Sequence, residues 1–186
     1  GFNMVRASRD GLLLANPNKR PFVLSRSNFL GGHRYAATWT GDNKSSWEQF
    51  EASVPMSLTL GLSGQPFNGP DIGGFVGSTN AHLLAHWTAL GVYYPFVRNH
   101  TTENSVAQEP WAFDKQTLDI CRTAINRRYR LMPYIYTLFE EASVNGMPVM
   151  RPLFMLDAKN PAFRTEEKAF MLGNDLYIIP RWAPEV

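Results

Sequence analysis

Residues 20–43 read RPFVLSRSNFLGGHRYAATWTGDN, and this stretch holds two short apolar runs that each lead into polar residues. The first run leads into Arg26 and the second, 36–40, leads into Asp42. In a barrel of parallel strands the chemistry collects where strands end and loops begin. The pattern therefore predicts two parallel strands that deliver Arg26 and Asp42 to one site.

Both residues have a second interpretation. Asp is favoured at helix N-caps and in turns, so Asp42 is also suited to such a position ahead of Ser45. For Arg26 an ion pair at the surface is the less favoured alternative. The residues alone leave these alternatives open.

The rest of the chain alternates predicted helices with predicted strands. Apolar periodicity and capping residues predict helices over 2–15, from a capping box at 45–48 to Gly61, from an Asn80 cap to Gly91, and from Asp114 to near Gly146 with a kink at Pro133. Strands are predicted at 22–25, 36–40, 62–67 and 92–97, and a loop with four glycines at 68–77. Four strands that alternate with helices make half of an eightfold β/α barrel, which typically needs about 250 residues.

Beyond the long helix, residues 149–155 and 176–179 predict strands of a separate β-rich unit. The chain starts in mid-pattern without Met, so we expect it to be part of something longer.

Composition describes an ordinary globular chain of 186 residues with 44% hydrophobic and 18% charged content. The net charge of +2 and the lack of a basic run give no reason to expect nucleic acid or an anionic membrane as a partner. We expect no signal peptide from the residues at the start of the sequence, and no apolar run is long enough to span a bilayer. The single cysteine, Cys121, excludes an internal disulfide, and the compartment stays open. Aromatic residues make up 13% of the chain, which suits both sugar stacking and plain packing.

The opening stretch, together with GLSGQPFNGPDIGGF at 61–75 and PFVRNH at 95–100, resembles glycoside hydrolase family 31, the α-glucosidases and α-xylosidases. These blocks are long and occur in order along nearly the whole chain, which makes the signal more specific than a lone short motif. The resemblance implies that the four strands are strands 5–8 of a (β/α)8 TIM barrel. It places the C-terminal half of that barrel at 1–151 and the start of a C-terminal β-sandwich domain at 152–186.

The resemblance also implies a retaining, exo-acting α-glycosidase that removes terminal α-linked glucose by double displacement. Such enzymes need two carboxyl groups about 5 Å apart, one as nucleophile and one as acid and then base. Asp42 matches the acid/base residue of the family. The nucleophile of the family lies in a Trp-x-Asp-Met-Asn-Glu type block, which does not occur here, so we expect it upstream of this sequence.

Other positions carry over from the family one at a time. Arg26 matches an arginine that hydrogen-bonds the sugar in the cleaved subsite. His100, which the sequence alone would place as a core histidine, matches a histidine that binds the hydroxyls of that sugar. Trp39 and Phe75 match aromatic residues of the glucose pocket. Asp71 and Arg98 match residues close by and are expected to pair with each other.

No cofactor or metal is required by this chemistry. His82 and His86 have the i, i+4 spacing of a zinc pair, but Leu83 stands where a metalloprotease has glutamate. The expected partners are an oligosaccharide or α-glucoside substrate and the upstream half of the same barrel, with no nucleic acid and no membrane. The competing hypotheses are an α-xylosidase or transglucosidase of the same family, and a catalytically incomplete sugar-binding or structural fragment.

Overall fold

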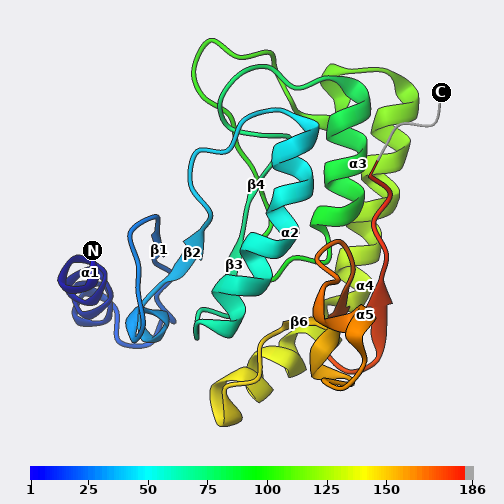
Figure 1. Cartoon of the computed structure of the whole chain (residues 1–186). Helices are drawn as coiled ribbons and strands as arrows, with labels where there is room; N and C mark the ends of the chain where they lie inside the picture. The colour runs from blue at the N-terminus through cyan, green and yellow to red at the C-terminus, as the bar shows by residue number, and fades with distance from the viewer. Residues whose placement is uncertain (183–186) are drawn as a thin grey trace.

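A computed structural model describes residues 1–182 and shows parallel strands covered by long helices (Figure 1). In Figure 1, α2, α3 and α4 stand beside one another, and α1 lies apart at the N-terminal side. The described elements, in chain order, are α1 (Phe2–Ala15), β1 (Leu24–Ser25), η1 (Gly32–Arg34), β2 (Ala37–Trp39), α2 (Trp47–Leu62), β3 (Asn68–Gly69), β4 (Asp71–Ile72), α3 (Ala81–Gly91), β5 (Arg98–Asn99), η2 (Pro110–Ala112), α4 (Lys115–Asn145), β6 (Met150–Pro152), η3 (Leu153–Met155), α5 (Pro161–Arg164), β7 (Phe170–Leu172) and β8 (Leu176–Ile178).

The strands from β1 to β5 run parallel, as the alternation with helices predicted. β2 lies between β1 and β3, and β4 pairs with β5. β3 and β4 flank Pro70, which has no backbone N–H to donate to a ladder. One segment of chain, 68–72, therefore pairs with the preceding strand through its first half and with the following strand through its second half.

Two of the predicted strands were placed wrongly. Residues 62–67 end α2 and form the turn after it, in which Gly64 has a φ of 77°, so the third strand position falls at 68–72. Residues 92–97 form turns after α3, in one of which Tyr94 N donates to Gly91 O at 2.9 Å. The fourth strand is β5, which follows these turns. Tyr94 is buried because this turn packs against the core. A short apolar run in the sequence does not show whether it forms a buried strand or a buried turn.

The helices follow their local signals more closely. Asn80 caps α3, Asp114 caps α4, and Gly146 ends α4 in the left-handed conformation with a φ of 79°. The N-cap of α2 is Ser46, whose Oγ accepts from Gln49 N at 3.3 Å, one residue later than the capping box predicted. α4 continues as a helix through Pro133.

The main core lies between the helices and the strands. α2 and α3 supply more than half of its buried side chains, among them Phe50, Val54, Leu58, Leu83, Leu84 and Trp87. Residues of the predicted β-rich stretch form an antiparallel sheet in the order β6-β7-β8, which includes one strand, β7, that was not predicted from the sequence.

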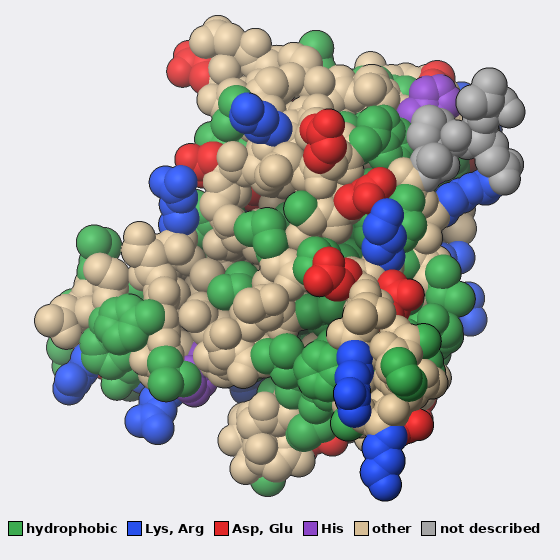
Figure 2. Space-filling model, viewed as in Figure 1, with side chains coloured by type: hydrophobic (Ala, Val, Ile, Leu, Met, Phe, Trp, Pro, Cys, Tyr) green, Lys and Arg blue, Asp and Glu red, His purple; other side chains and the backbone are tan. Residues whose placement is uncertain are grey.

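Apolar side chains reach the surface on the lobe that α1 and the following segment form (Figure 2). Met4, Leu14, Phe29 and Leu30 are all more than half exposed there. On the face over α2 in Figure 2, acidic and basic side chains are interspersed. Among residues 1–182, no helix combines the length and the apolar character needed to cross a membrane.

Candidate functional site

Each of the four strand positions is followed, within three residues, by a residue that the sequence singled out. Arg26 follows β1, and Asp42 lies three residues after β2. Phe75 lies three residues after β4, and His100 follows β5. Since the strands are parallel, their carboxyl ends lie at one edge of the sheet, which is where a β/α barrel carries its chemistry.

Asp42 and Arg26 meet at this edge. A distance of 3.5 Å separates Arg26 Nη2 from Asp42 Oδ2, and the two side chains are 60% and 38% exposed. Gly41 has a φ of 100°, and a Cβ at this position would lie 3.6 Å from Arg26 Nε. Because Ser46 is the N-cap of α2, Asp42 does not serve as the cap of that helix. Its carboxylate, although paired with Arg26, is partly open to solvent.

The loop that carries Asp42 is hydrogen-bonded to the loop that carries Phe75. The backbone oxygen of Asn43 accepts from Phe75 N at 2.7 Å and from Val76 N at 3.0 Å. The side chain of Asn43 donates to the backbone oxygen of Asp71 at 2.9 Å. These bonds fix the position of Asp42 relative to the end of β4.

Phe75 stacks on His100. Their ring centroids are 5.0 Å apart and the ring planes differ by 24°. The backbone oxygen of Phe75 accepts from Thr102 N at 3.0 Å and from Thr101 Oγ1 at 3.3 Å. Hydrogen bonds thus join the loop after β2, which carries the exposed Asp42, to the loop after β4, and join that loop to the loop after β5.

Asp71 and Arg98 form a buried pair behind this surface. Asp71 is 0% exposed, and its Oδ1 accepts from Arg98 Nε and lies 2.7 Å from both Nε and Nη2. The Arg98 guanidinium lies over the Trp39 ring, 4.9 Å from its centroid. Arg98 therefore packs against the Trp39 ring, while its partner Asp71 is not exposed at the surface.

Burial raises the pKa of Asp71 above its ordinary value of 3.8, because a carboxylate is poorly solvated there. The hydrogen bond and charge of Arg98 oppose this rise in pKa, and the charge of His100 also opposes it. The negative charge of Asp42 adds to the rise in the Asp71 pKa. Asp42, Asp71, Arg98 and His100 are therefore close enough to form one electrostatic cluster.

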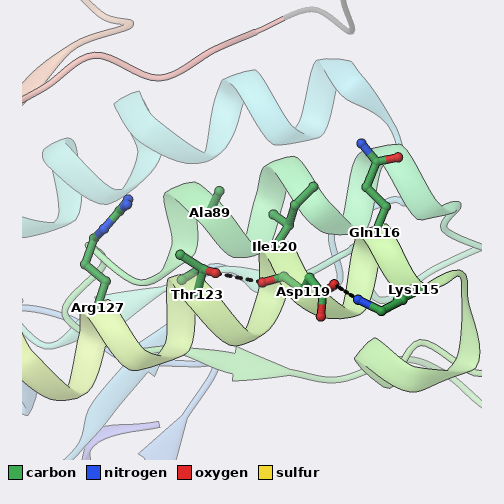
Figure 3. A pocket seen from close by; sticks show the side chains of 8 residues that line it. Ala89, Lys115, Gln116, Asp119, Ile120, Thr123 and Arg127 are labelled. Carbon is green, nitrogen blue, oxygen red and sulfur yellow. Dashed lines mark hydrogen bonds and ion pairs between the residues drawn. The ribbon is translucent and has the colours of Figure 1, made fainter.

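Two hollows flank the cluster. One, of about 500 Å³, is lined in part by Arg26, Trp39 and Thr40, and the other, of about 440 Å³, is lined in part by His100 and Trp111. A further hollow of about 600 Å³ lies on the outer face of α3 and α4, where Lys115 pairs with Asp119 (Figure 3). That outer hollow is away from the strand ends, so we place the candidate site at the cluster.

Sequence reasoning missed Gln108 and Asn99, two amide residues that bond to each other beside His100. A glutamine in a polar loop carries no local signal that would mark it as buried. Within the described residues 1–182, no three His, Cys, Asp or Glu side chains gather closely enough to hold a metal ion.

Comparison with known proteins identifies the family of the chain. Residues 1–138 match the family model described as the glycosyl hydrolases family 31 TIM-barrel domain. A probable glucan 1,3-alpha-glucosidase of Arabidopsis thaliana is 47% identical over 96% of this chain and 19% of its own length. Neutral alpha-glucosidase C of Mus musculus is 44% identical over 100% of this chain and 21% of its own length.

A solved structure gives the same result. The family 31 alpha-glucosidase from Bacteroides thetaiotaomicron is 56% identical to this chain and superposes with a TM-score of 0.94. That match covers 100% of this chain and 32% of the solved one. The chain spans about a fifth of the length of the curated relatives named above.

Proposed function

This chain belongs to glycosyl hydrolases family 31, and on that premise we propose that it supplies the acid/base half of the active site of a retaining α-glucosidase. The observation that carries the proposal is the exposed Asp42 carboxylate, 3.5 Å from Arg26 and joined through its loop to the Phe75–His100 stack. Four parallel strand positions make half of an eight-stranded barrel. The other strands would come from residues outside this sequence, in the same protein.

In the proposed reaction Asp42 acts first as an acid. Its carboxyl proton passes to the glycosidic oxygen as the bond from that oxygen to the anomeric carbon breaks, and a second carboxylate bonds to the anomeric carbon. In the second step, the Asp42 carboxylate takes a proton from water while the water oxygen replaces the second carboxylate. Glucose leaves with its anomeric configuration retained.

The second carboxylate is proposed to lie outside this chain. Asp71 belongs to the same cluster, but it is fully buried and paired with Arg98, so a sugar cannot reach it. Retention needs the two carboxyl groups about 5 Å apart across the sugar. Asp42, with its side chain 38% exposed, is open to such an arrangement.

The remaining site residues are proposed to hold the sugar. Arg26 can donate to sugar hydroxyls while it orients Asp42, because a guanidinium carries several donors in a fixed plane. His100 is exposed and offers ring nitrogens to hydroxyls. Phe75 and Trp39 offer ring surface to the C–H face of a sugar. Asp71 and Arg98 are proposed to act from behind, through Trp39.

The substrate proposed is terminal α-linked glucose, in keeping with relatives that are named glucan 1,3-alpha-glucosidase and neutral alpha-glucosidase C. A sugar acceptor in place of water would make the same site a transglucosidase, and an α-xylosidase would act on the corresponding xyloside. Initial rates on 4-nitrophenyl α-glucoside, 4-nitrophenyl α-xyloside and maltose, with and without added sugar acceptor, separate the three activities.

The test of the proposal compares the full-length protein with its Asp42→Asn variant. We expect kcat for maltose to fall by about 10²- to 10⁴-fold, the usual contribution of an acid/base group. The loss should be smaller for 4-nitrophenyl α-glucoside, because a good leaving group hardly needs an acid.

The matched control is Asp10→Asn, which removes an exposed carboxylate that pairs with Arg6 on α1, away from the cluster. This variant should retain the wild-type kcat on both substrates. Hydrolysis of maltose by Asp42→Asn at the wild-type rate would refute the acid/base role. A wild-type protein inactive on all three substrates would favour a sugar-binding or structural part instead.

A further inference from the structure

The loop after β5 holds a single deeply buried side chain. Residues 100–109 contain no helix or strand, and most of them are partly or fully exposed. Gln108 is the exception, at 4% exposed. A loop of this kind keeps one geometry only when its contacts offset the entropy lost on ordering it. The contacts of Gln108 therefore matter for everything that the loop carries.

Gln108 forms a reciprocal pair with Asn99, which we call the amide clamp. Gln108 Nε2 donates to Asn99 Oδ1 at 2.7 Å, and Asn99 Nδ2 donates to the Gln108 backbone oxygen at 2.7 Å. Gln108 Nε2 also donates to the backbone oxygen of Ile72 at 3.2 Å. Ile72 and Asn99 are opposite each other in the β4–β5 ladder, so the amide clamp closes over the end of that ladder.

The chain around Gln108 is shaped to admit it. Gly73 has a φ of 87°, and a Cβ at this position would lie 3.2 Å from Gln108 Oε1 and 3.1 Å from Leu84 Cδ1. The contact is tighter than a side chain would normally make. The glycine thus leaves the space that the glutamine side chain occupies.

The amide clamp adjoins the proposed sugar site. Asn99 directly precedes His100, whose ring stacks on Phe75, and Thr102 N donates to the Phe75 backbone oxygen at 3.0 Å. Farther along the loop, Val106 N donates to Ser78 Oγ at 3.2 Å. The loop is therefore bonded to the loop after β4 through Thr102 and Val106, which follow His100 in the chain. The amide clamp bonds the same loop to the β4–β5 ladder.

We propose that Gln108 is a positioning residue, which acts through Asn99 to hold His100 and Phe75 in the geometry that binds the sugar. The proposal rests on the proposed function, since the site that Gln108 organises is the proposed glucose pocket. It extends that function to a residue that touches neither the sugar nor the reacting atoms.

The experiment uses the full-length protein and its Gln108→Met variant, which keeps the side-chain length and removes both donated hydrogen bonds. We expect KM for maltose and the inhibition constant of glucose to rise about tenfold or more, because small displacements of binding groups are costly. We expect kcat to change less than KM. Asn99→Ala should give the same pattern, and the double variant should be no worse than the more affected single variant.

Two controls separate positioning from general stability. Gln116→Met makes the same substitution at an exposed position on α4 and should leave both constants unchanged. Arg151→Met removes buried bonds in the antiparallel sheet, so it should lower Tm without raising the inhibition constant of glucose. A Gln108→Met variant with a lowered Tm but wild-type constants for glucose and maltose would overturn the proposal.

Failure of the proposed function would look different. In that case the wild-type protein would neither hydrolyse maltose nor bind glucose. Amide hydrogen exchange then tests the amide clamp directly, because residues 100–106 should exchange faster in Gln108→Met than in the wild type. Unchanged exchange in these residues would refute the positioning role whatever the activity of the protein.

Discussion

At position 74 the backbone leaves no room for a side chain. Gly74 has a φ of 88°, and a Cβ there would lie 2.4 Å from Ser45 Cα, a backbone atom of the loop that follows Asp42. Gly77 has nearly the same backbone, with a φ of 87°, but a Cβ there would meet nothing within 4 Å. The two glycines therefore separate backbone strain from steric clash.

We predict that Gly77→Ala lowers the free energy of unfolding by about 1 kcal/mol, from the left-handed backbone alone. Gly74→Ala should lower it by roughly 3 kcal/mol, because the clash with Ser45 is added. Gly74→Ala should also reduce kcat/KM for maltose, since the displaced loop carries Asp42. Calorimetric Tm and steady-state kinetics of both variants check this, and equal effects at the two glycines would contradict it.

The family resemblance singled out residues that the fold brings to the carboxyl ends of the strands. Packing decides which of these residues are exposed and which are buried. Arg26 and Asp42 lie together in the open, while Asp71 is sealed behind Trp39 with Arg98. Nothing in the sequence distinguishes the exposed aspartate from the buried one, because burial depends on the loops that cover it.

Among the elements, α4 starts at an acidic cap that should respond to pH. Asp114 accepts from Thr117 N at 2.7 Å, and this hydrogen bond holds the pKa of Asp114 below its ordinary value of 3.8. A carboxyl with a lowered pKa in the folded state stabilises the fold above pH 3.8 and loses that contribution as the pH falls through the folded-state pKa.

We therefore predict that wild type is more stable than Asp114→Asn at pH 7 and that the difference shrinks as the pH falls below 3.8. Thermal melts of both proteins from pH 7 to pH 3 measure it. The opposite change, Asn80→Asp at the cap of α3, should introduce the same pH dependence. If the difference in Tm between wild type and Asp114→Asn stayed constant with pH, the charge of Asp114 would not contribute to the stability of the fold.

Helices were easier to predict than strands for a physical reason. A helix closes its hydrogen bonds within a few residues, so its caps and its periodicity are written locally, as at Asn80 and Gly146. The strands here are only two or three residues long and pair with segments distant in sequence. An apolar run such as 92–97 looks the same whether it forms a strand or a buried turn.

For the whole molecule, Arg151 links the barrel helices to the antiparallel sheet. Its side chain is 3% exposed, its Nη2 lies 2.5 Å from Glu141 Oε2 on α4, and its Nε donates to the Pro148 backbone oxygen at 2.9 Å. It also donates to Asn174 Oδ1 in the turn between β7 and β8. One side chain thus holds α4 and two strands of the sheet together.

We predict that Arg151→Met lowers the free energy of unfolding by about 2–4 kcal/mol, because buried partners lose their hydrogen bonds. The matched control is Arg122→Met, which removes an exposed arginine that pairs with Asp119 on the same helix and should cost less than about 1 kcal/mol. Chemical denaturation of both variants measures the contrast. Similar losses in the free energy of unfolding would mean that the buried Arg151–Glu141 pair contributes no more than the exposed Arg122–Asp119 pair.

The division of the chain at 151 and 152 remains our proposal, with the barrel half before it and the start of a β domain after it. β6 (Met150–Pro152) crosses that boundary and pairs with β7 of the antiparallel sheet. Residues 183–186 of the proposed β domain lie outside the described part of the chain.

The sequence by itself determined the four long helices, the α/β alternation and the family, because caps, periodicity and motif blocks are all local properties of the chain. Only the tertiary structure decided where the short strands lie, which aspartate is open to solvent, and that Gln108 is bound to Asn99. Those features depend on contacts between residues far apart in the chain or on what other loops cover. Each side chain acquires them only when the loops at the strand ends are packed against one another.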